Sequence, residues 1–373
     1  MKFAFCLFAA ATLAVSAEEA PIRVKVSSKF SIALSGLAGA DLETLRKDLA
    51  MSGSFNIVPG AEAEFTVSGS GGADLQGQVK DRAGKVVLAN GYSGPGRSRI
   101  HKFANDIVET ITGSPGIAGT KVAFAATKSG KKEIYTCEID GANLVQLTND
   151  NSIAVSPHLS ADGRTLLYTG YQSGYADVYR VELGSGSRSR IMKYPGTNSG
   201  AAFSPNGGSI AVTLSKDGNP ELYVTGGGGG GARRLTRTAG VESSPTWSPD
   251  GRELIYSSDE GGSPQLYRIA SGGGSPERLA TGFGYNTAPN WSPDGKKVAF
   301  NTRGGGGFSV AILDLSGGAR TLGEGEGPVW GPDSRHVLIA TGGSLVLLDT
   351  ATGTRTPIIG GLGKISEPTW SRQ

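Results

Sequence analysis

The sequence predicts a small α/β N-terminal domain followed by an all-β six-bladed β-propeller, which the C-terminal strand closes. Three observations predict this fold. Helical periodicity is present before residue 115 and absent after it, and variants of SPTWSPDGRELIYSS recur down the second part. The 59 glycines among 373 residues, spread between short apolar runs, favour many tight turns. The predicted boundaries are 1–17 for a signal peptide, 18–115 for the α/β domain and 116–373 for the propeller.

The first seventeen residues are typical of a secretory signal. Lys2 precedes an apolar run that ends in Ala-Val-Ser-Ala, which predicts cleavage after Ala17. The run is shorter than the roughly 20 residues that a spanning helix needs, and no later stretch is long and apolar enough. The mature chain is therefore expected to be exported and not membrane-spanning. Cys137 is then its one cysteine, so we expect no internal disulfide and a small buried apolar role for this residue.

The α/β domain is predicted to hold two helices that cover one face of a sheet. Asp41 is the expected cap of the first helix, whose Leu42, Leu45 and Leu49 form one stripe, and Gly53 ends it. The second helix is strongly amphipathic and stops at Gly113. The predicted helices span 41–53 and 97–113, the predicted strands span 22–28, 55–58 and 64–70, and a hairpin spans 74–92 with its turn at 82–84.

The repeat defines the blades of the propeller. Its copies lie at 156–170, 201–215, 244–258, 288–302 and 327–341. The turn Asp or Asn recurs every 44 residues three times and then after 39, a period that is typical of four-stranded propeller blades. Pro, Asp and Gly in SPDG suit successive turn positions, so the motif needs no catalytic purpose.

The two ends of the propeller sequence complement each other. Residues 119–148 supply the second, third and fourth strands of a blade without the innermost one, whereas 366–373 supply an innermost strand with nothing after it. The segment 367–371 is therefore predicted to complete the first blade. This closure gives six blades and removes the exposed edges of a linear array.

Catalytic and cofactor signatures are weak throughout. A peptidase attached to a propeller needs a G-x-S-x-G elbow, which GYSGPG at 91–96 only approaches. His101, His158 and His336 form no metal-ligand spacing, so structural or surface roles are favoured for them. GGLGK at 360–364 lacks the Ser/Thr of a phosphate loop, and the glycine run 226–231 is interpreted as a floppy hairpin loop, with ordering on a partner as the alternative. We therefore predict no catalytic, metal or cofactor site. The net charge of +3, without a Lys/Arg run, disfavours nucleic acid as a partner.

The loops that lead into the innermost strands are expected to meet at one mouth of the channel. Small, amide and acidic residues dominate them, with one aromatic, which suits hydrogen bonds to a polypeptide or small polar ligand; tight solvent-facing turns are the alternative. The candidate residues are Thr197, Asn198, Ser199, Gly200, Glu242, Ser243, Ser244, Tyr285, Asn286, Thr287, Glu324 and Glu326.

The ordered set of motifs resembles the TolB family of the Tol–Pal envelope system of Gram-negative bacteria. The resemblance rests on the signal peptide, on DLETLRKDLAMSGSFNIVP, ANDIVETITGSPG and KEIYTCEIDGANLVQLT, on the SPxWSPDG blades and on the terminal EPTWS. It implies a monomeric, non-enzymatic periplasmic scaffold without cofactors that supports outer-membrane integrity and cell division.

The resemblance also implies partners. The peptidoglycan-associated lipoprotein Pal would bind the propeller mouth, and other outer-membrane proteins are further candidates. TolA would bind the N-terminal segment of the mature chain, through Glu18, Glu19, Ile22, Arg23 and Val24. The alternative function is that of a propeller enzyme or carbohydrate-binding protein that acts on a polar polymer.

Overall fold

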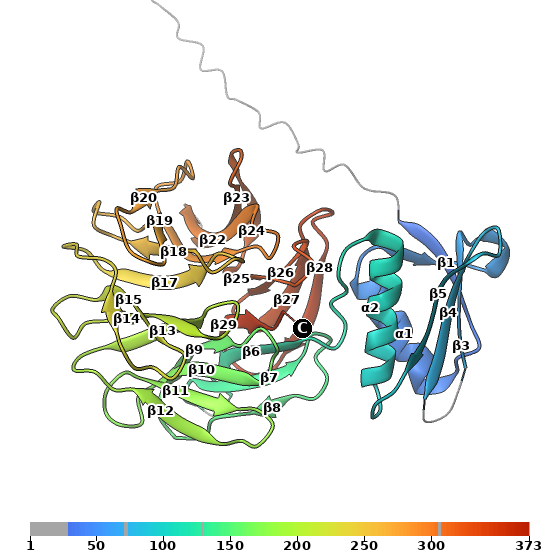
Figure 1. The fold of residues 1–373 in the computed structure, drawn as a ribbon, viewed down its shortest axis with the longest axis horizontal. Coiled ribbons are helices and arrows are strands. Elements are labelled where there is room, and N and C mark those ends of the chain that lie inside the picture. Colours follow the sequence, from blue (N-terminus) through green and yellow to red (C-terminus); the bar gives the residue numbers. More distant parts are fainter. Residues whose placement is uncertain (1–28, 71–73, 129, 305–306, 373) are drawn as a thin grey trace, which may run out of the picture.

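A computed structural model describes residues 29–372 apart from 71–73, 129 and 305–306, and it confirms an α/β domain followed by a six-bladed propeller (Figure 1). The predicted signal peptide, the strand at 22–28 and the proposed TolA segment lie outside the described residues. The α/β domain ends with its second helix at Thr112, and the propeller starts with a strand at Lys121. The predicted boundary at 115 falls in the segment between them.

The N-terminal domain is a five-stranded sheet with both helices on the side that faces the propeller (Figure 1). The strand order is β2-β1-β3-β4-β5, with parallel pairing of β1 to β2 and β3, and antiparallel pairing from β3 to β5. The elements are β1 Phe30–Ser35, α1 Gly39–Met51, β2 Phe55–Ile57, the 3₁₀ helix η1 Gly60–Glu62, β3 Phe65–Ser70, β4 Leu75–Asp81, β5 Val86–Tyr92 and α2 Ser98–Thr112. Strand β1 was not among the predicted elements.

The apolar stripes of the two helices form the core of this domain. Leu45 and Leu49 of α1 are buried, as are Ile100, Phe103 and Ile107 of α2, and all pack with apolar residues of the sheet. Gly113 ends α2 with φ +72°, a conformation that favours glycine.

The expected cap at Asp41 is wrong. Helix α1 begins two residues earlier, at Gly39, and Ala38 precedes it without a side-chain cap. Asp41 therefore lies in the first turn, where its carboxylate suits the positive end of the helix dipole. It pairs instead with Arg99 of α2, at 2.7 Å between Oδ2 and Nη2.

The propeller consists of six four-stranded antiparallel blades. We number them in ring order, from the innermost strand outwards. Blade 1 comprises β29 Ile365–Trp370, β6 Lys121–Ala126, β7 Glu133–Glu138 and β8 Val145–Gln146; blade 2, β9 Ala154–Leu159, β10 Thr165–Gly170, β11 Asp177–Glu182 and β12 Arg188–Met192; blade 3, β13 Asn198–Phe203, β14 Ser209–Leu214, β15 Glu221–Gly226 and β16 Arg233–Arg234. Blade 4 comprises β17 Glu242–Trp247, β18 Glu253–Ser258, β19 Gln265–Ala270 and β20 Glu277–Arg278; blade 5, β21 Asn286–Trp291, β22 Lys297–Gly304, β23 Gly307–Asp314 and β24 Ala319–Glu324; blade 6, β25 Glu326–Trp330, β26 His336–Ala340, β27 Ser344–Asp349 and β28 Arg355–Gly360.

The predicted closure of the ring is confirmed. Strand β29 pairs antiparallel with β6, and its Trp370 lies opposite Val122 and donates from Nε1 to Thr120 Oγ1 at 2.8 Å. Glu367 links the closing strand to the next blade, because its Oε2 accepts from the backbone N–H of Ser156 at 2.6 Å. The strand thus completes blade 1 and links it to blade 2.

The SPDG segments form turns between the first and second strands, as predicted. In blade 4 the Asp250 carboxylate accepts from Ser248 Oγ at 2.6 Å and from the N–H of Arg252 at 3.1 Å, and Gly251 has φ +72°. The Asp side chain therefore holds the turn together from inside.

Two loop predictions need correction. The glycine run is a compact hydrogen-bonded turn, not a floppy loop: Gly229 N–H donates to Gly226 O, and a Cβ at Gly227 would lie 2.6 Å from Gly207 O. The segment 323–327 is mostly strand, because only Gly325 separates β24 from β25. This direct connection replaces the longer loop that leads into β21, which is why the last repeat spacing is shorter. The predicted role of Cys137 is confirmed, since it is buried on β7.

Candidate partner-binding surface

The propeller has two rims of different construction. We call the mouth rim the set of connections that lead into the innermost strands, such as 193–197 and 237–241, together with the hairpins between second and third strands, such as 171–176. The turn rim contains the SPDG turns and the hairpins between third and fourth strands. Antiparallel strands place these connections at opposite ends of each blade.

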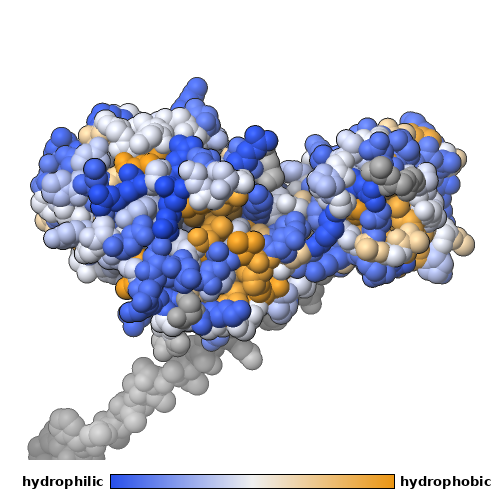
Figure 2. All heavy atoms as spheres, turned by 90° about the horizontal axis from the view of Figure 1, so that it is seen from below, coloured by the Kyte–Doolittle hydropathy of each residue, from blue (hydrophilic) through white to orange (hydrophobic). Residues whose placement is uncertain are grey.

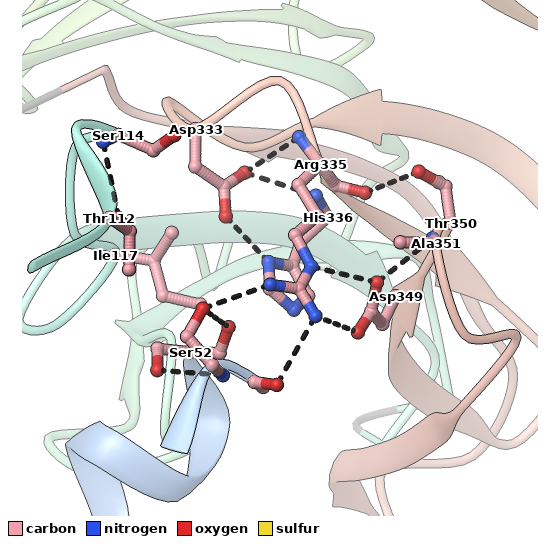
Figure 3. Close-up of polar contacts among 12 residues, drawn as sticks. Ser52, Thr112, Ser114, Ile117, Asp333, Arg335, His336, Asp349, Thr350 and Ala351 are labelled. Carbon is pink, nitrogen blue, oxygen red and sulfur yellow. Dashed lines mark hydrogen bonds and ion pairs between the residues drawn. The ribbon is translucent and has the colours of Figure 1, made fainter. Parts of the chain in front are cut away.

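The N-terminal domain is attached to the turn rim. Arg335, in the turn of blade 6, donates from Nη1 to Ser54 Oγ at 2.9 Å and from Nη2 to Gly53 O at 3.2 Å. The guanidinium is held by two hydrogen bonds to Asp349, at 3.0 and 2.7 Å (Figure 3). Burial alone would raise the pKa of Asp349, but the hydrogen bond from Arg335 and the nearby positive charges lower it to about 2. Asp349 is therefore ionised, and it orients Arg335 toward the end of α1.

A second polar contact joins the N-terminal domain to blade 1. Arg97 pairs with Asp140, in the hairpin between β7 and β8, and Lys47 Nζ lies 3.4 Å from the same carboxylate. His101 bridges Asp48 Oδ2 at 2.8 Å and Glu138 Oε2 at 3.4 Å. Burial would lower the pKa of His101, but the hydrogen bond and charge of Asp48 and the charge of Glu138 outweigh it and raise the pKa. Sequence reasoning missed this junction, since no local motif links these positions.

The predicted mouth residues lie on the mouth rim or at the start of the innermost strands, but they are not equally accessible. Asn198, Glu242 and Asn286 are completely buried at the first position of β13, β17 and β21. Asn198, for example, donates from Nδ2 to Ala176 O and Tyr194 O. These three side chains are occupied within the blades, so the expectation that they face a partner does not hold for them in this structure. Thr197, Ser199, Gly200, Ser243, Ser244, Tyr285, Thr287, Glu324 and Glu326 retain exposed surface.

Buried polar pairs connect neighbouring blades beneath the mouth rim. At the junction of blades 4 and 5, Asn286 Nδ2 donates to Gln265 Oε1 at 2.8 Å. The same two positions at the junction of blades 3 and 4 hold Glu221 and Glu242, two carboxyl groups. Burial and the hydrogen bond with Glu221 raise the pKa of Glu242 to about 7. Hydrogen bonds, among them one from Arg234 Nη2 to Glu221 Oε1 at 2.6 Å, lower the pKa of Glu221, so Glu242 is the member of the pair that binds a proton more readily.

The mouth rim carries apolar side chains that sequence reasoning missed. Tyr175, in the hairpin between β10 and β11, is 72% exposed, and Tyr171 and Ile153 are exposed nearby in blade 2, where Tyr171 N–H donates to Ile153 O. Val241 is exposed beside β17, and the ring of Tyr285 lies 6.0 Å from that of Phe308. Two tyrosines in the hairpin sequence YQSGYAD were the available signal. Exposed aromatic residues with a polar tip are common in protein interfaces.

Apolar surface is sparse elsewhere. The face in Figure 2 is mostly hydrophilic, with apolar residues gathered in limited areas of the propeller and the N-terminal domain. Among the described residues, the large apolar side chains exposed away from the mouth rim are Ile57, Val86, Val87, Leu144 and Val145.

The innermost strands share a backbone irregularity that shapes the channel. One residue in each of the six has φ between +49° and +62°, and each strand breaks register with its neighbour there. This left-handed conformation costs energy for residues other than glycine, and four of the six are not glycine. The six positions are Ser156, Gly200, Ser244, Ala288, Gly327 and Glu367. The bulges turn the strands so that these residues line the channel.

The described part of the chain contains no group of three or more His, Cys, Asp or Glu residues placed to hold a metal ion. No helix within it has the length and apolar character to cross a membrane.

Known proteins that resemble this chain share its β-propeller. The family model of the TolB β-propeller domain matches residues 108–373. A TolB homologue of Chlorobium chlorochromatii is 40% identical over 156 residues, which cover 40% of this chain and 32% of that protein. The Tol-Pal system protein TolB of Desulfosudis oleivorans is 41% identical over 90 residues, 23% of this chain and 20% of that protein. The alignments thus span about a third or less of these curated relatives. The crystal structure of TolB from Acinetobacter baumannii has a TM-score of 0.83 at 25% identity and covers 92% of this chain and 97% of its own.

Proposed function

This chain belongs to the TolB family of β-propeller proteins, and on that premise we propose that it is a non-enzymatic scaffold of the Tol–Pal system in the periplasm. It binds the lipoprotein Pal at the mouth rim and TolA through the N-terminal segment of the mature chain, and it supports outer-membrane integrity and cell division. The family match carries the assignment to the system. The differences between the two rims support the mouth rim as the surface that binds Pal.

The mouth rim is the better candidate for Pal because the contacts that the described residues of the N-terminal domain make lie on the turn rim, and because the mouth rim bears exposed and half-buried aromatic side chains. Tyr175 and Tyr285 supply rigid contact area with a polar tip, and Glu324 and Glu326 add exposed acidic groups beside the channel. The turn rim is partly covered by the N-terminal domain, which Arg335 of the propeller contacts at Ser54 and whose Arg97 pairs with Asp140 of the propeller. A partner on the mouth rim therefore displaces none of these contacts.

A pull-down from envelope extract tests this proposal. The tagged mature protein is expected to recover a lipoprotein with a peptidoglycan-binding domain and, through residues 18–24, TolA. A variant that lacks residues 18–24 should lose TolA and retain the lipoprotein. Repeated recovery of neither partner, from extract in which both are detected, would refute the proposed role.

A further inference from the structure

The central channel differs in chemistry from both rims. It has a volume of about 440 Å³ and is lined by the innermost strands of all six blades. Eight prolines line it: Pro157, Pro205, Pro245, Pro249, Pro289, Pro293, Pro328 and Pro368. Proline has no N–H group and presents an apolar ring, so these prolines give the wall an apolar, donor-poor surface.

The acidic group in this lining is already paired. Glu367 accepts the N–H of Ser156 and lies 3.3 Å from Lys132 Nζ. Among the described residues, the other ionisable groups in the lining are His158 and Arg372.

Arg372 is a cation without a carboxylate partner among the described residues. Its backbone N–H donates to Ala161 O at 2.8 Å, which places it at the turn-rim end of the channel. Its guanidinium reaches Trp291 O of blade 5 in one long contact, at 3.4 Å from Nη2. Burial lowers the pKa of Arg372 to about 10, and no described carboxylate counters that effect. The guanidinium thus retains most of its hydrogen-bonding capacity.

His158 supplies a second donor in the same lining. Its Nδ1 accepts from the N–H of Phe203 at 3.4 Å, which assigns the proton of the neutral ring to Nε2. Burial and the charge of Arg372 lower the pKa of His158 to about 4, so the ring is neutral at pH 7. The turn-rim end of the channel therefore combines one positive charge with one neutral donor.

We propose that this end of the channel, at Arg372 and His158, binds a single carboxylate group. A guanidinium fork matches the two oxygens of a carboxylate, and one cation balances one negative charge. A phosphate would bring a second charge that no described residue in the lining neutralises, which is unfavourable in an enclosed site. The carboxylate can belong to a small free acid or to an acidic side chain of a peptide. The site lies opposite the surface proposed for Pal, so its existence does not depend on that proposal.

Tryptophan fluorescence offers a direct readout. All four tryptophans of the chain belong to innermost strands, and three of them, Trp247, Trp330 and Trp370, line the channel. The probes are acetate, the blocked peptide Gly-Glu-Gly and its matched neutral peptide Gly-Gln-Gly, each titrated into the mature protein. We expect saturable fluorescence changes with carboxylate probes alone. The bound carboxylate should also raise the pKa of His158, followed by NMR of the imidazole, by about one unit or more.

Variants separate a binding site from general effects of charge. Arg372→Gln should weaken binding of the Glu peptide at least about tenfold, whereas Arg372→Lys should weaken it less, because charged hydrogen bonds carry the affinity. Arg164→Gln is the matched control, since it removes a charge from the turn of blade 2 where the side chain is 84% exposed; binding should not change. His158→Gln, which keeps a side-chain acceptor, provides a second test if Arg372→Gln fails to fold.

The outcomes are distinct. Equal binding of acetate and the Glu peptide would assign the site to a free small acid, whereas tighter binding of the peptide would assign it to a polypeptide. Equal responses to the Glu and Gln peptides, or unchanged binding in both Arg372→Gln and His158→Gln, would overturn the proposal. None of these outcomes alters binding of Pal, which is measured in parallel.

Discussion

The two rims of the propeller are made from the same strands but differ in how regular their sequences are and in which side chains they expose. On the turn rim the sequence repeats: Ser, Asp and Gly recur, and Asp250 and Asp294 form equivalent hydrogen bonds in their turns. On the mouth rim the sequence varies from blade to blade, and aromatic, acidic and small residues are exposed. The conspicuous repeat thus stabilises the ring and supports the N-terminal domain, whereas the proposed partner contacts lie on the rim whose sequence varies.

Removal of the strand that closes the ring, and so supports both rims, should have the largest effect on stability. Deleting 367–373 removes buried Trp370, the hydrogen bond of Glu367 to blade 2 and the pairing of Thr369 and Trp370 with β6. Loss of a buried Trp alone costs about 3–5 kcal/mol, so the melting temperature of the propeller should fall by at least about 10 °C. Differential scanning calorimetry measures this.

The N-terminal domain has a core of its own and supplies an internal reference. Trp370→Ala should give a smaller shift in the same direction. A truncated protein that melts at the same temperature as the full-length one would contradict the closure of the ring.

The next largest effect is the dependence of stability on pH that Glu242, buried beneath the mouth rim, should cause. The pKa of Glu242 is raised to about 7 in the folded protein, so its stabilising contribution is complete below the unfolded value near 4.5 and is lost as pH rises through 7. The free energy of unfolding should fall by up to about 3 kcal/mol between pH 5 and pH 8 from this group.

Glu242→Gln tests this sign. The Gln side chain imitates the protonated Glu. It also places an amide where the next junction has the amide of Asn286, which pairs with Gln265. Urea unfolding at pH 5 and pH 8 should show a smaller loss for the variant than for the wild type. Identical pH dependence in the two proteins would exclude Glu242 as the group that titrates.

A moderate effect is expected where the turn rim meets the N-terminal domain. Arg335→Ala leaves Asp349, which is buried, without its partner and removes the hydrogen bonds to Gly53 and Ser54. Stability should fall by about 1–3 kcal/mol, and the segment 113–120 should be cleaved faster in limited proteolysis. The control is Arg252→Ala, whose side chain is 85% exposed on the same rim. Equal cleavage rates for Arg335→Ala and Arg252→Ala would show that Arg335 does not hold the domains together.

The smallest effect belongs to the motif that is most visible in the sequence. Asp250→Ala removes two hydrogen bonds within one exposed turn, so the loss of stability should be about 0.5–1.5 kcal/mol, measured by urea unfolding. Binding of Pal should be unchanged. A large loss of binding would give the SPDG turns a role beyond structure.

The propeller was predictable because its information is local and repeated. Each SPDG turn specifies its own hairpin, and the missing strand of 119–148 could be matched to EPTWS at the far end by counting. The helices followed from the stripes of Leu45 and Leu49 and of Ile100 and Phe103. Asp41 was misassigned because a capping residue two positions inside a helix looks the same in sequence as one at its start.

The surface was less predictable because exposure depends on contacts between distant residues. Glu242 and Ser244 are two residues apart, yet one is buried against Glu221 and the other is exposed. The pairs of Arg335 with Ser54 and of Arg97 with Asp140 join positions that no local pattern relates. The channel cation Arg372 is recognisable only once the six blades surround it.

The affinity for Pal measured on matched variants of the two rims tests the central claim most directly. Isothermal titration calorimetry with the soluble domain of Pal from the same bacterium would compare the wild type, Tyr175→Ala with Tyr285→Ala on the mouth rim, and Arg164→Ala with Arg252→Ala on the turn rim. Because a few aromatic residues carry most of the energy of an interface, the mouth-rim variant should bind at least about tenfold more weakly, and the turn-rim variant should bind like the wild type. Weakened binding by the turn-rim variant, with unchanged binding by the mouth-rim variant, would contradict the account.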